Sequence, residues 1–236
     1  MFIINAYRYL VTLIHTTFDG MNEYITLGSD SSITIQRTDT VSISAWVYRD
    51  VAGINHYIYG GRRSGDIYNT NALSIRSTNK VSFWLRSSNV TPLHQLRVNT
   101  TTSISTGVWT HILVTYDGTS TPSGTKIYIN GISDTLTTEF DTLTTDLNVT
   151  SMEMNIGTLM PTEGWFDGKI DKVIFYNTEL TAGNVTTIYN YGRKPGLIGI
   201  GGEVSQWEMD TLNPVDVVGS NNGTSVNQDS SNIVNG

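Results

Sequence analysis

The chain has 236 residues, a formal net charge of −7 and no cysteine. This length suffices for one large domain, and the lack of cysteine excludes a disulfide framework and a thiolate metal site. The acidic balance argues against nucleic acid or an anionic membrane as a partner, because both attract basic surfaces. No segment approaches the length of a membrane-spanning helix, so we expect no membrane insertion.

The first predicted strand lies close to the N-terminus. The apolar run at residues 10–14 is shorter than the apolar region of a secretion signal, is broken by Thr12 and lacks a small-residue cleavage site. We therefore interpret it as a strand rather than as a targeting segment. The run FDGMNEYITLG at residues 18–28 follows. Its Asp-Gly pair predicts a tight turn, and its period-two alternation predicts a half-buried strand.

The same alternation recurs along the chain. It is found in SISAWVYRD, VSFWLRSS, WTHILVTYDG, TKIYING and FDGKIDKVIFYN. In the first of these, Ile43, Ala45 and Val47 share one face, opposite a polar and aromatic set. Asn130-Gly131 between two apolar runs predicts a hairpin, because both residues tolerate positive φ. Strands at irregular spacing with turn residues between them are typical of a sandwich or barrel.

A short helix is predicted near residues 181–191, with Thr181 as its N-cap and Gly192 as a stop signal. Beyond Pro195 the composition turns to Gly, Asn and Ser, with one further strand at VSQWEMD. We therefore divide the chain into a domain at residues 1–195 and a C-terminal extension at 196–236. Termini stay disordered unless they are tied down, so we expect a neighbouring subunit to hold the extension if it is ordered.

The order of these motifs resembles one known family. The resemblance covers residues 17–192 and is carried by FDGMNEYITL, SISAWVY, FWL, VWTHILVTYDG, KIYING, MNIG, FDGKIDKVIFYN and LTAGNVTTIYNYG. These motifs resemble the laminin-G-like or pentraxin-like branch of the concanavalin A-like lectin/glucanase superfamily. The resemblance implies an all-β fold, a two-sheet antiparallel jelly-roll sandwich. It also implies a calcium ion at one rim in many members, and ligands on a concave face or on loops, mostly without catalysis.

A cation site can be proposed from the same motifs. Asp19 and Asn22 lie in one turn, and the resemblance implies that the strand carrying Asp171 lies close to it. Calcium prefers hard oxygen ligands such as carboxylates and amide carbonyls, so calcium is the cofactor we expect here. The alternative is that Asp19 and Asn22 cap a local turn through the backbone, and that Asp171 lies at a solvated strand edge.

The sequence does not favour catalysis. The four histidines are dispersed and lack the paired spacing of a zinc site. Glycosidases need two cooperating carboxylates, and the resemblance implies an E-x-D-x-E strand for the glucanase branch. The nearest match, Glu208-Met209-Asp210, lacks the third acid. We therefore expect no enzymatic activity.

Five residues are candidates for ligand binding: Trp46, Trp84, Trp165, Arg62 and Arg63. Aromatic faces bind sugar rings, and Trp46 and Trp84 share strand faces with polar neighbours. Trp165 lies in a Gly-rich loop, where exposure is expected, and the Arg pair lies in a hairpin-like segment where it could contact an acidic partner. The alternative is that the tryptophans fill the core and that the arginines are solvated.

The whole chain also resembles virion structural proteins of bacteriophages that carry this domain. The N-terminal NAYRY and the segment from Trp207 to Thr224 carry that similarity. We therefore hypothesise a capsid decoration or tail or fibre component, made in the host cytoplasm and located in the virion. It would display its jelly roll for surface or glycan recognition, with copies of itself, other virion proteins or cell-surface and environmental glycans as partners. The alternative is a free, extracellular, calcium-dependent carbohydrate-binding lectin.

Overall fold

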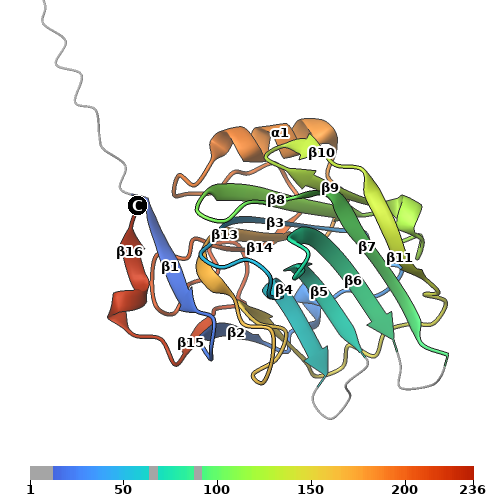
Figure 1. Ribbon diagram of the computed structural model, residues 1–236, viewed down its shortest axis with the longest axis horizontal. Coiled ribbons are helices and arrows are strands. Elements are labelled where there is room, and N and C mark those ends of the chain that lie inside the picture. The colour runs from blue at the N-terminus through green and yellow to red at the C-terminus, as the bar shows by residue number, and fades with distance from the viewer. Residues whose placement is uncertain (1–12, 64–68, 88–91) are drawn as a thin grey trace, which may run out of the picture.

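Two antiparallel sheets of eight strands each face one another across an apolar core. This computed structural model describes residues 13–63, 69–87 and 92–236 (Figure 1). Within those ranges it contains one α-helix, α1 (Ala182–Tyr191). The predicted all-β, two-sheet jelly-roll sandwich is therefore confirmed. Among the described residues, no helix has the length and hydropathy needed to span a bilayer.

The first sheet, sheet A, has the order β10-β9-β8-β3-β13-β1-β16, and β14 also pairs with β13. Its strands are β1 (Ile14–Asp19), β3 (Val41–Arg49), β8 (Trp109–Tyr116), β9 (Thr125–Ile129), β10 (Ile132–Ser133), β13 (Asp167–Tyr176), β14 (Glu203–Trp207) and β16 (Ile233–Asn235). The strand expected over residues 10–14 begins at Ile14, and residues 10–12 lie outside the described part of the chain.

The second sheet, sheet B, has the order β11-β7-β6-β5-β4-β12-β2-β15. Its strands are β2 (Tyr24–Gly28), β4 (His56–Arg63), β5 (Thr70–Ile75), β6 (Lys80–Ser87), β7 (His94–Ser103), β11 (Leu136–Asp141), β12 (Met152–Ile156) and β15 (Thr224–Val226). Short 3-10 helices occupy Ser31–Ile33, Pro122–Gly124 and Ser230–Asn232.

Period-two alternation determines which side chains enter the core. On β3, Ile43, Ala45 and Val47 are buried between the sheets, whereas Trp46 belongs to the opposite face. The predicted Asn130-Gly131 hairpin joins β9 to β10, with φ angles of 51° and 78° at these two residues. Both positive values match the turn type that the sequence predicts.

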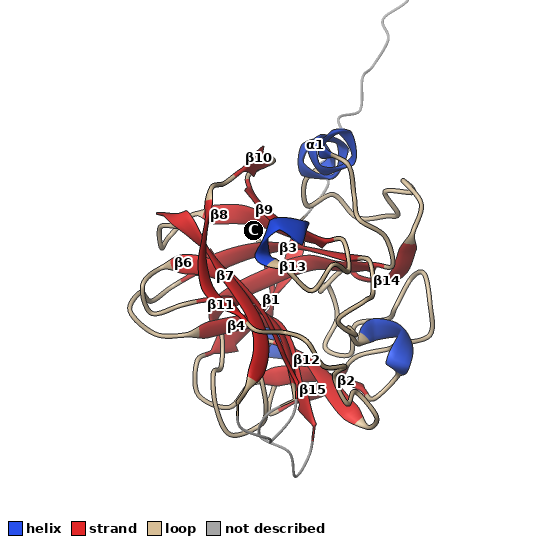
Figure 2. Cartoon of the chain, turned by 90° about the vertical axis from the view of Figure 1, so that its right-hand side faces the viewer, coloured by secondary structure: helices blue, strands red, loops and turns tan. Residues whose placement is uncertain are grey.

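The helix α1 packs on the outer side of sheet A (Figure 2). It begins after Thr181, whose side chain accepts a hydrogen bond from the backbone N–H of Asn184, as the sequence predicts for an N-cap. Its buried residues Val185 and Ile188 form a second apolar cluster with Ile174 and other residues of sheet A. The helix therefore covers a face that would otherwise expose apolar side chains.

The segment at residues 196–236 contributes strands to both sheets. β14 pairs with β13, β15 pairs with β2, and β16 pairs with β1 (Figure 1). Trp207 at the end of β14 belongs to the main core and has no exposed surface. The tail is thus held by strands of its own chain, and contacts with a neighbouring subunit remain a prediction.

Candidate functional site

The outer face of sheet B carries two of the five predicted ligand-binding residues, Arg62 and Trp84. On β6, Phe83 and Leu85 enter the core, so Trp84 between them projects from the other face. Strand pairing places Arg97 of β7 and Ala72 of β5 on either side of it. We call this surface the Trp84 face. Its main side chains are Arg62, Trp84, Arg86, Gln95 and Arg97.

Trp84 is covered by an arginine and does not offer an open stacking surface. The guanidinium carbon of Arg97 lies 3.7 Å from the centroid of the Trp84 ring, which is 7% exposed. The indole Nε1 donates a hydrogen bond of 3.2 Å to Oε1 of Gln95. Glu139 on β11 accepts from Nη1 of Arg97 at 3.3 Å. The indole therefore fixes the position of the guanidinium, which in turn holds a carboxylate.

The carboxylate of Glu139 is suited to accepting hydrogen bonds rather than to proton transfer. Burial alone would raise its pKa, but the hydrogen bond from Asn99 and the positive charge of Arg97 outweigh burial and lower the pKa below its usual value. A glycosidase acid needs a raised pKa so that it carries a proton near neutral pH. This site instead holds an ionised acceptor beside a fixed donor.

A loop at residues 157–166 packs against the Trp84 face. Leu159 in this loop is buried against Tyr57, Ala72 and Trp84. Glu163 forms an ion pair of 2.7 Å with Nη1 of Arg62, and the Arg62 side chain is only 12% exposed.

Trp165 follows in the same loop and is half-buried. Its indole Nε1 is buried and has no hydrogen-bond acceptor among the described residues. Arg63 ends β4 one position after Arg62, so strand alternation sends its side chain to the opposite side. Of the five candidates, Arg62 and Trp84 thus lie on one face, Trp165 lies in the loop that packs against that face, and Arg63 does not join them.

Trp46 lies on the other sheet. Its ring stacks on Tyr189 of α1, with centroids 5.7 Å apart and an interplanar angle of 18°. His111 of β8 lies beside it at 5.2 Å. This stacking attaches α1 to sheet A. Trp46 therefore lies on the outer face of sheet A, and the full thickness of the sandwich separates it from the Trp84 face.

The structure does not bring Asp19, Asn22 and Asp171 together. The pairing of β1 with β13 places Asp167 opposite Asp19, and Asp171 lies four positions farther along β13. Four residues of strand correspond to about 13 Å. Oδ1 of Asp19 accepts from the backbone N–H groups of Met21 and Asn22, at 2.9 and 3.2 Å. The local turn that was the alternative interpretation is therefore present.

Asp171 is enclosed rather than available to a cation. It is 1% exposed, and its Oδ2 lies 3.4 Å from Nη1 of Arg193. Burial raises the pKa of this carboxyl to about 7, although the neighbouring Arg193 and Lys172 oppose that rise. The described residues include no group of three His, Asp or Glu side chains that could hold a metal ion. These three residues do not fit a calcium site.

Sequence reasoning missed Gln95, Arg97 and Glu139. Period two in HQLRV does place Gln95 and Arg97 on one face of a strand, and that signal was available. Nothing in the sequence indicated that this strand lies beside the one that carries Trp84, because cross-strand register depends on partners far away in the chain.

A two-sheet jelly roll with a polar and aromatic outer face is the architecture of a lectin-like β-sandwich. The chain belongs to the concanavalin A-like lectin/glucanases superfamily, whose laminin G-type family model matches residues 19–186. A comparison with curated proteins finds no match.

Several solved structures share this fold. One is a candidate carbohydrate-binding protein from Bacteroides ovatus, with a TM-score of 0.62 and 19% identity, over 96% of this chain. The chain spans 60% of the length of that protein. The native heptameric SAP-like pentraxin of Limulus polyphemus has a TM-score of 0.58 and 13% identity, over 94% of each chain. The IT-sialidase CBM40 of Ruminococcus gnavus, bound to α2,3-sialyllactose, has a TM-score of 0.53 and 13% identity, over 75% of this chain and 98% of that one.

Proposed function

We propose that this protein is a non-catalytic carbohydrate-binding protein and that saccharides bind on the Trp84 face. The observation that carries the proposal is the fixed position of Arg97 on Trp84, beside Gln95 and Glu139. Specific binding of a hydroxyl-rich ligand needs polar groups that are already held in place, since ordering them on binding weakens affinity. Two of the similar structures are described as carbohydrate-binding, which supports this proposal.

The carboxylates of this face support binding rather than hydrolysis. Glu139 pairs with Arg97, and Glu163 pairs with Arg62. Glycoside hydrolysis needs one protonated and one ionised carboxyl on either side of the scissile bond. Both carboxylates are instead engaged with an arginine and can accept hydrogen bonds from sugar hydroxyl groups.

A glycan array followed by calorimetric titration with the full chain tests the proposal. The variant Glu163→Gln removes the charge that positions Arg62 at an exposed site of the loop. Its matched control is Glu179→Gln, which breaks the exposed 2.5 Å pair with Lys126 elsewhere on the molecule. We expect Glu163→Gln alone to weaken the binding of an array hit. Equal binding by both variants would contradict the placement of the site on the Trp84 face.

Calcium dependence is tested in the same titrations. The binding measurement is repeated with added calcium and with a chelator, because a calcium requirement remains part of the lectin hypothesis. Loss of binding in the chelator that calcium restores would support a calcium-dependent lectin. Unchanged affinity in the chelator would show that this chain binds saccharides without the ion.

We propose a role in a virion as the second function. It is supported by the position of the two ends of the described chain, which lie side by side where the backbone N–H of Gly236 donates to the carbonyl of Leu13 at 2.9 Å. Attachment through this one edge would leave the rest of the sandwich displayed outward. Purified phage particles that contain the protein at a fixed stoichiometry would support this role, and its absence from purified particles would exclude it.

A further inference from the structure

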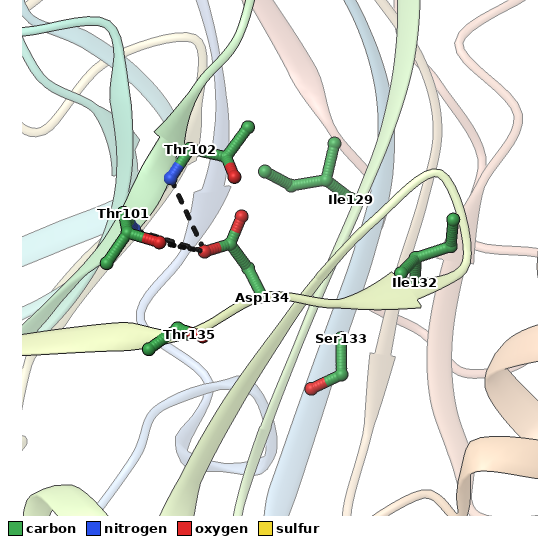
Figure 3. A pocket seen from close by; sticks show the side chains of 7 residues that line it. All are labelled: Thr101, Thr102, Ile129, Ile132, Ser133, Asp134 and Thr135. Atoms are coloured by element: carbon green, nitrogen blue, oxygen red, sulfur yellow. Dashed lines mark hydrogen bonds between the residues drawn. The ribbon is translucent and has the colours of Figure 1, made fainter.

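A groove lies at the seam where the edges of the two sheets meet, away from the Trp84 face. It has a volume of about 350 Å³ and is formed by the end of β7 and by the β9–β10 hairpin with the residues that follow it (Figure 3). We call it the seam groove. Its principal side chains are Thr101, Thr102, Ile129, Ile132, Ser133 and Asp134. This volume lies within the range of about 300–1,000 Å³ of small-molecule sites.

The carboxylate of Asp134 holds the groove together. Oδ1 accepts from the backbone N–H and the hydroxyl of Thr101, at 3.1 and 2.9 Å, and from the backbone N–H of Thr102 at 3.4 Å. The side chain of Thr102 also hydrogen-bonds to this carboxylate. Figure 3 shows the second oxygen, Oδ2, directed toward the side on which the Thr102 hydroxyl and Ile129 lie. Because an ionised carboxylate has about four lone-pair sites, Oδ2 keeps the capacity to accept a further hydrogen bond from a ligand.

The charge of the groove limits which ligands can bind. Burial alone would raise the pKa of Asp134, but hydrogen bonds from Thr102 and Thr101 outweigh burial and lower it, so the carboxylate is ionised at neutral pH. The lining contains no Lys, Arg or His. An anionic ligand would meet a negative charge without a compensating cation, whereas hydroxyl groups can donate to Oδ2.

Aliphatic side chains supply the other half of the recognition surface. Ile132 at the tip of the hairpin is 74% exposed, and Ile129 lines the same groove. A smaller cavity of about 190 Å³ shares Thr102 and Ile129 with it and extends toward Val108, which is 51% exposed. Exposed aliphatic groups beside fixed polar groups match a ligand with apolar C–H faces and hydroxyl edges.

The walls of the groove are already in place. The hairpin is fixed where the backbone N–H of His111 donates to Oδ1 of Asn130 at 2.9 Å. A Cβ at Gly131 would lie 3.0 Å from the Tyr189 ring, so the hairpin is packed against α1. A preformed groove binds without first ordering its own walls.

We propose that the seam groove binds a neutral saccharide, with Oδ2 of Asp134 accepting from sugar hydroxyl groups and Ile129 and Ile132 packing against the ring. This inference rests on the proposed carbohydrate binding but assigns a second site, separate from the Trp84 face. The ligand class follows from the single carboxylate, the hydroxyl groups and the lack of a cationic side chain in the lining.

Amide chemical-shift mapping of the ¹⁵N-labelled full chain tests the proposal. The probes are glucose, galactose, mannose, N-acetylglucosamine and their disaccharides at millimolar concentration, with 3′-sialyllactose as the acidic comparison. We expect a neutral probe to shift the amides of Thr101, Thr102 and Asp134. Asp134→Asn keeps the Oδ1 acceptor but turns Oδ2 into a donor, so binding should weaken about tenfold or more. Asp117→Asn, in a similar Asp–Thr turn outside the groove, is the matched control and should bind normally.

Ile132→Ser is a second variant that keeps the proposal testable if Asp134→Asn folds poorly. Because Ile132 is so exposed, its loss should weaken binding without unfolding the chain. Shifts confined to Gln95 and Arg97 would overturn this inference and leave the proposed function standing, whereas no binding of any saccharide would contradict both. Groove shifts that depend on protein concentration alone would assign the groove to a second copy of the chain. If 3′-sialyllactose shifted the amides of the groove residues as much as the neutral probes do, the assignment to neutral saccharides would be overturned.

Discussion

The indole Nε1 of Trp207 donates a hydrogen bond of 2.7 Å to the backbone carbonyl oxygen of Asn221. Both residues lie in the Gly- and Asn-rich segment that composition alone would assign to a tail. Trp207 is fully buried in the main core, and Asn221 is 7% exposed. The C-terminal segment is therefore a structural part of the sandwich.

Deletion of residues 199–236 should prevent folding, because it removes β14, β15, β16 and a core tryptophan. Trp207→Ala should lower the free energy of unfolding by about 3–5 kcal/mol, as is usual for a buried tryptophan. Trp165→Ala, at a half-buried loop position, is the control and should have a much smaller effect. Circular dichroism and urea denaturation measure both, and a cooperative, native-like transition in the truncated chain would contradict this view of the segment.

Gly131→Ala should destabilise the protein through backbone strain and through steric crowding against Tyr189. Gly131 has a φ of +78°, and a Cβ there would lie 3.0–3.2 Å from atoms of Tyr189. The positive φ alone costs an alanine about 1 kcal/mol. Gly199→Ala, with a φ of +68° and nothing within 4 Å, measures that strain by itself. The difference in melting temperature between the two variants reports the contact with Tyr189, and equal losses would argue against it.

Thr181→Ala should lower the free energy of unfolding by about 0.5–2 kcal/mol, because it removes the N-cap of α1. Thr186→Ala is the matched control inside the helix. Its hydroxyl bonds back to the carbonyl of Ala182, and alanine is the better helix former there, so stability should be kept or improved. Urea denaturation separates the two variants. A larger loss of unfolding free energy in Thr186→Ala than in Thr181→Ala would contradict the importance of the N-cap for the stability of α1.

Stability should decrease as the pH falls from about 6.5 to about 4. Burial is the largest cause that lowers the pKa of His15 and of His56 to about 4, and of His111 to about 3. In that window the unfolded chain binds protons that the folded chain does not, so the unfolded state gains stability as the solution is acidified.

His56 offers a direct test of this dependence. Its Nδ1 accepts from the backbone N–H of Asp167 at 3.1 Å, and its Nε2 lies 2.9 Å from the carbonyl oxygen of Val51. The ring is therefore neutral in the folded chain, with Nε2 as the donor. His56→Gln should flatten the plot of unfolding free energy against pH between 4 and 6.5, whatever its constant effect on stability. An unchanged slope would contradict the assignment.

Asp171 should change the free energy of unfolding with pH in the direction opposite to that of the histidines. Its pKa is raised from 3.8 to about 7 by burial, so between these values the folded chain binds more protons than the unfolded chain. Its contribution to the free energy of unfolding is complete below the unfolded pKa of 3.8 and is lost as the pH rises toward the folded pKa of about 7. Relative to the parent, Asp171→Asn should become more stable as the pH is raised from 4 to 7. A constant difference in unfolding free energy at pH 4 and pH 7 would argue against the raised pKa.

Local sequence features predicted their own structures well. The alternation in SISAWVY predicted a strand with Ile43 and Ala45 on one face, which the structure buries in the core, and Asn130-Gly131 predicted the observed hairpin. Thr181 predicted the start of the helix. Each of these depends on φ preferences, side-chain periodicity or one capping bond, all of which act within a few residues. Such signals are readable in a single sequence.

Long-range pairing could not be predicted in the same way. Any strand can pair with any other through its backbone, so the partner is chosen by packing across the whole chain. The resemblance implied that Asp171 lies near Asp19, whereas the register of β13 places Asp167 there. Arg62 and Trp84 were named separately, and only the pairing of β4, β5 and β6 shows that they share a face.

The sequence by itself determined the class of fold and the positions of most strands, because these follow from local periodicity and composition. Tertiary structure alone decided that Arg97 lies on Trp84, that Asp134 joins β7 at the seam, and that the last residues of the chain complete the first strands. Thr17 and Asn232, which share a hydrogen bond, are 215 positions apart. Contacts over such separations form only when the entire core assembles, and no local pattern encodes them.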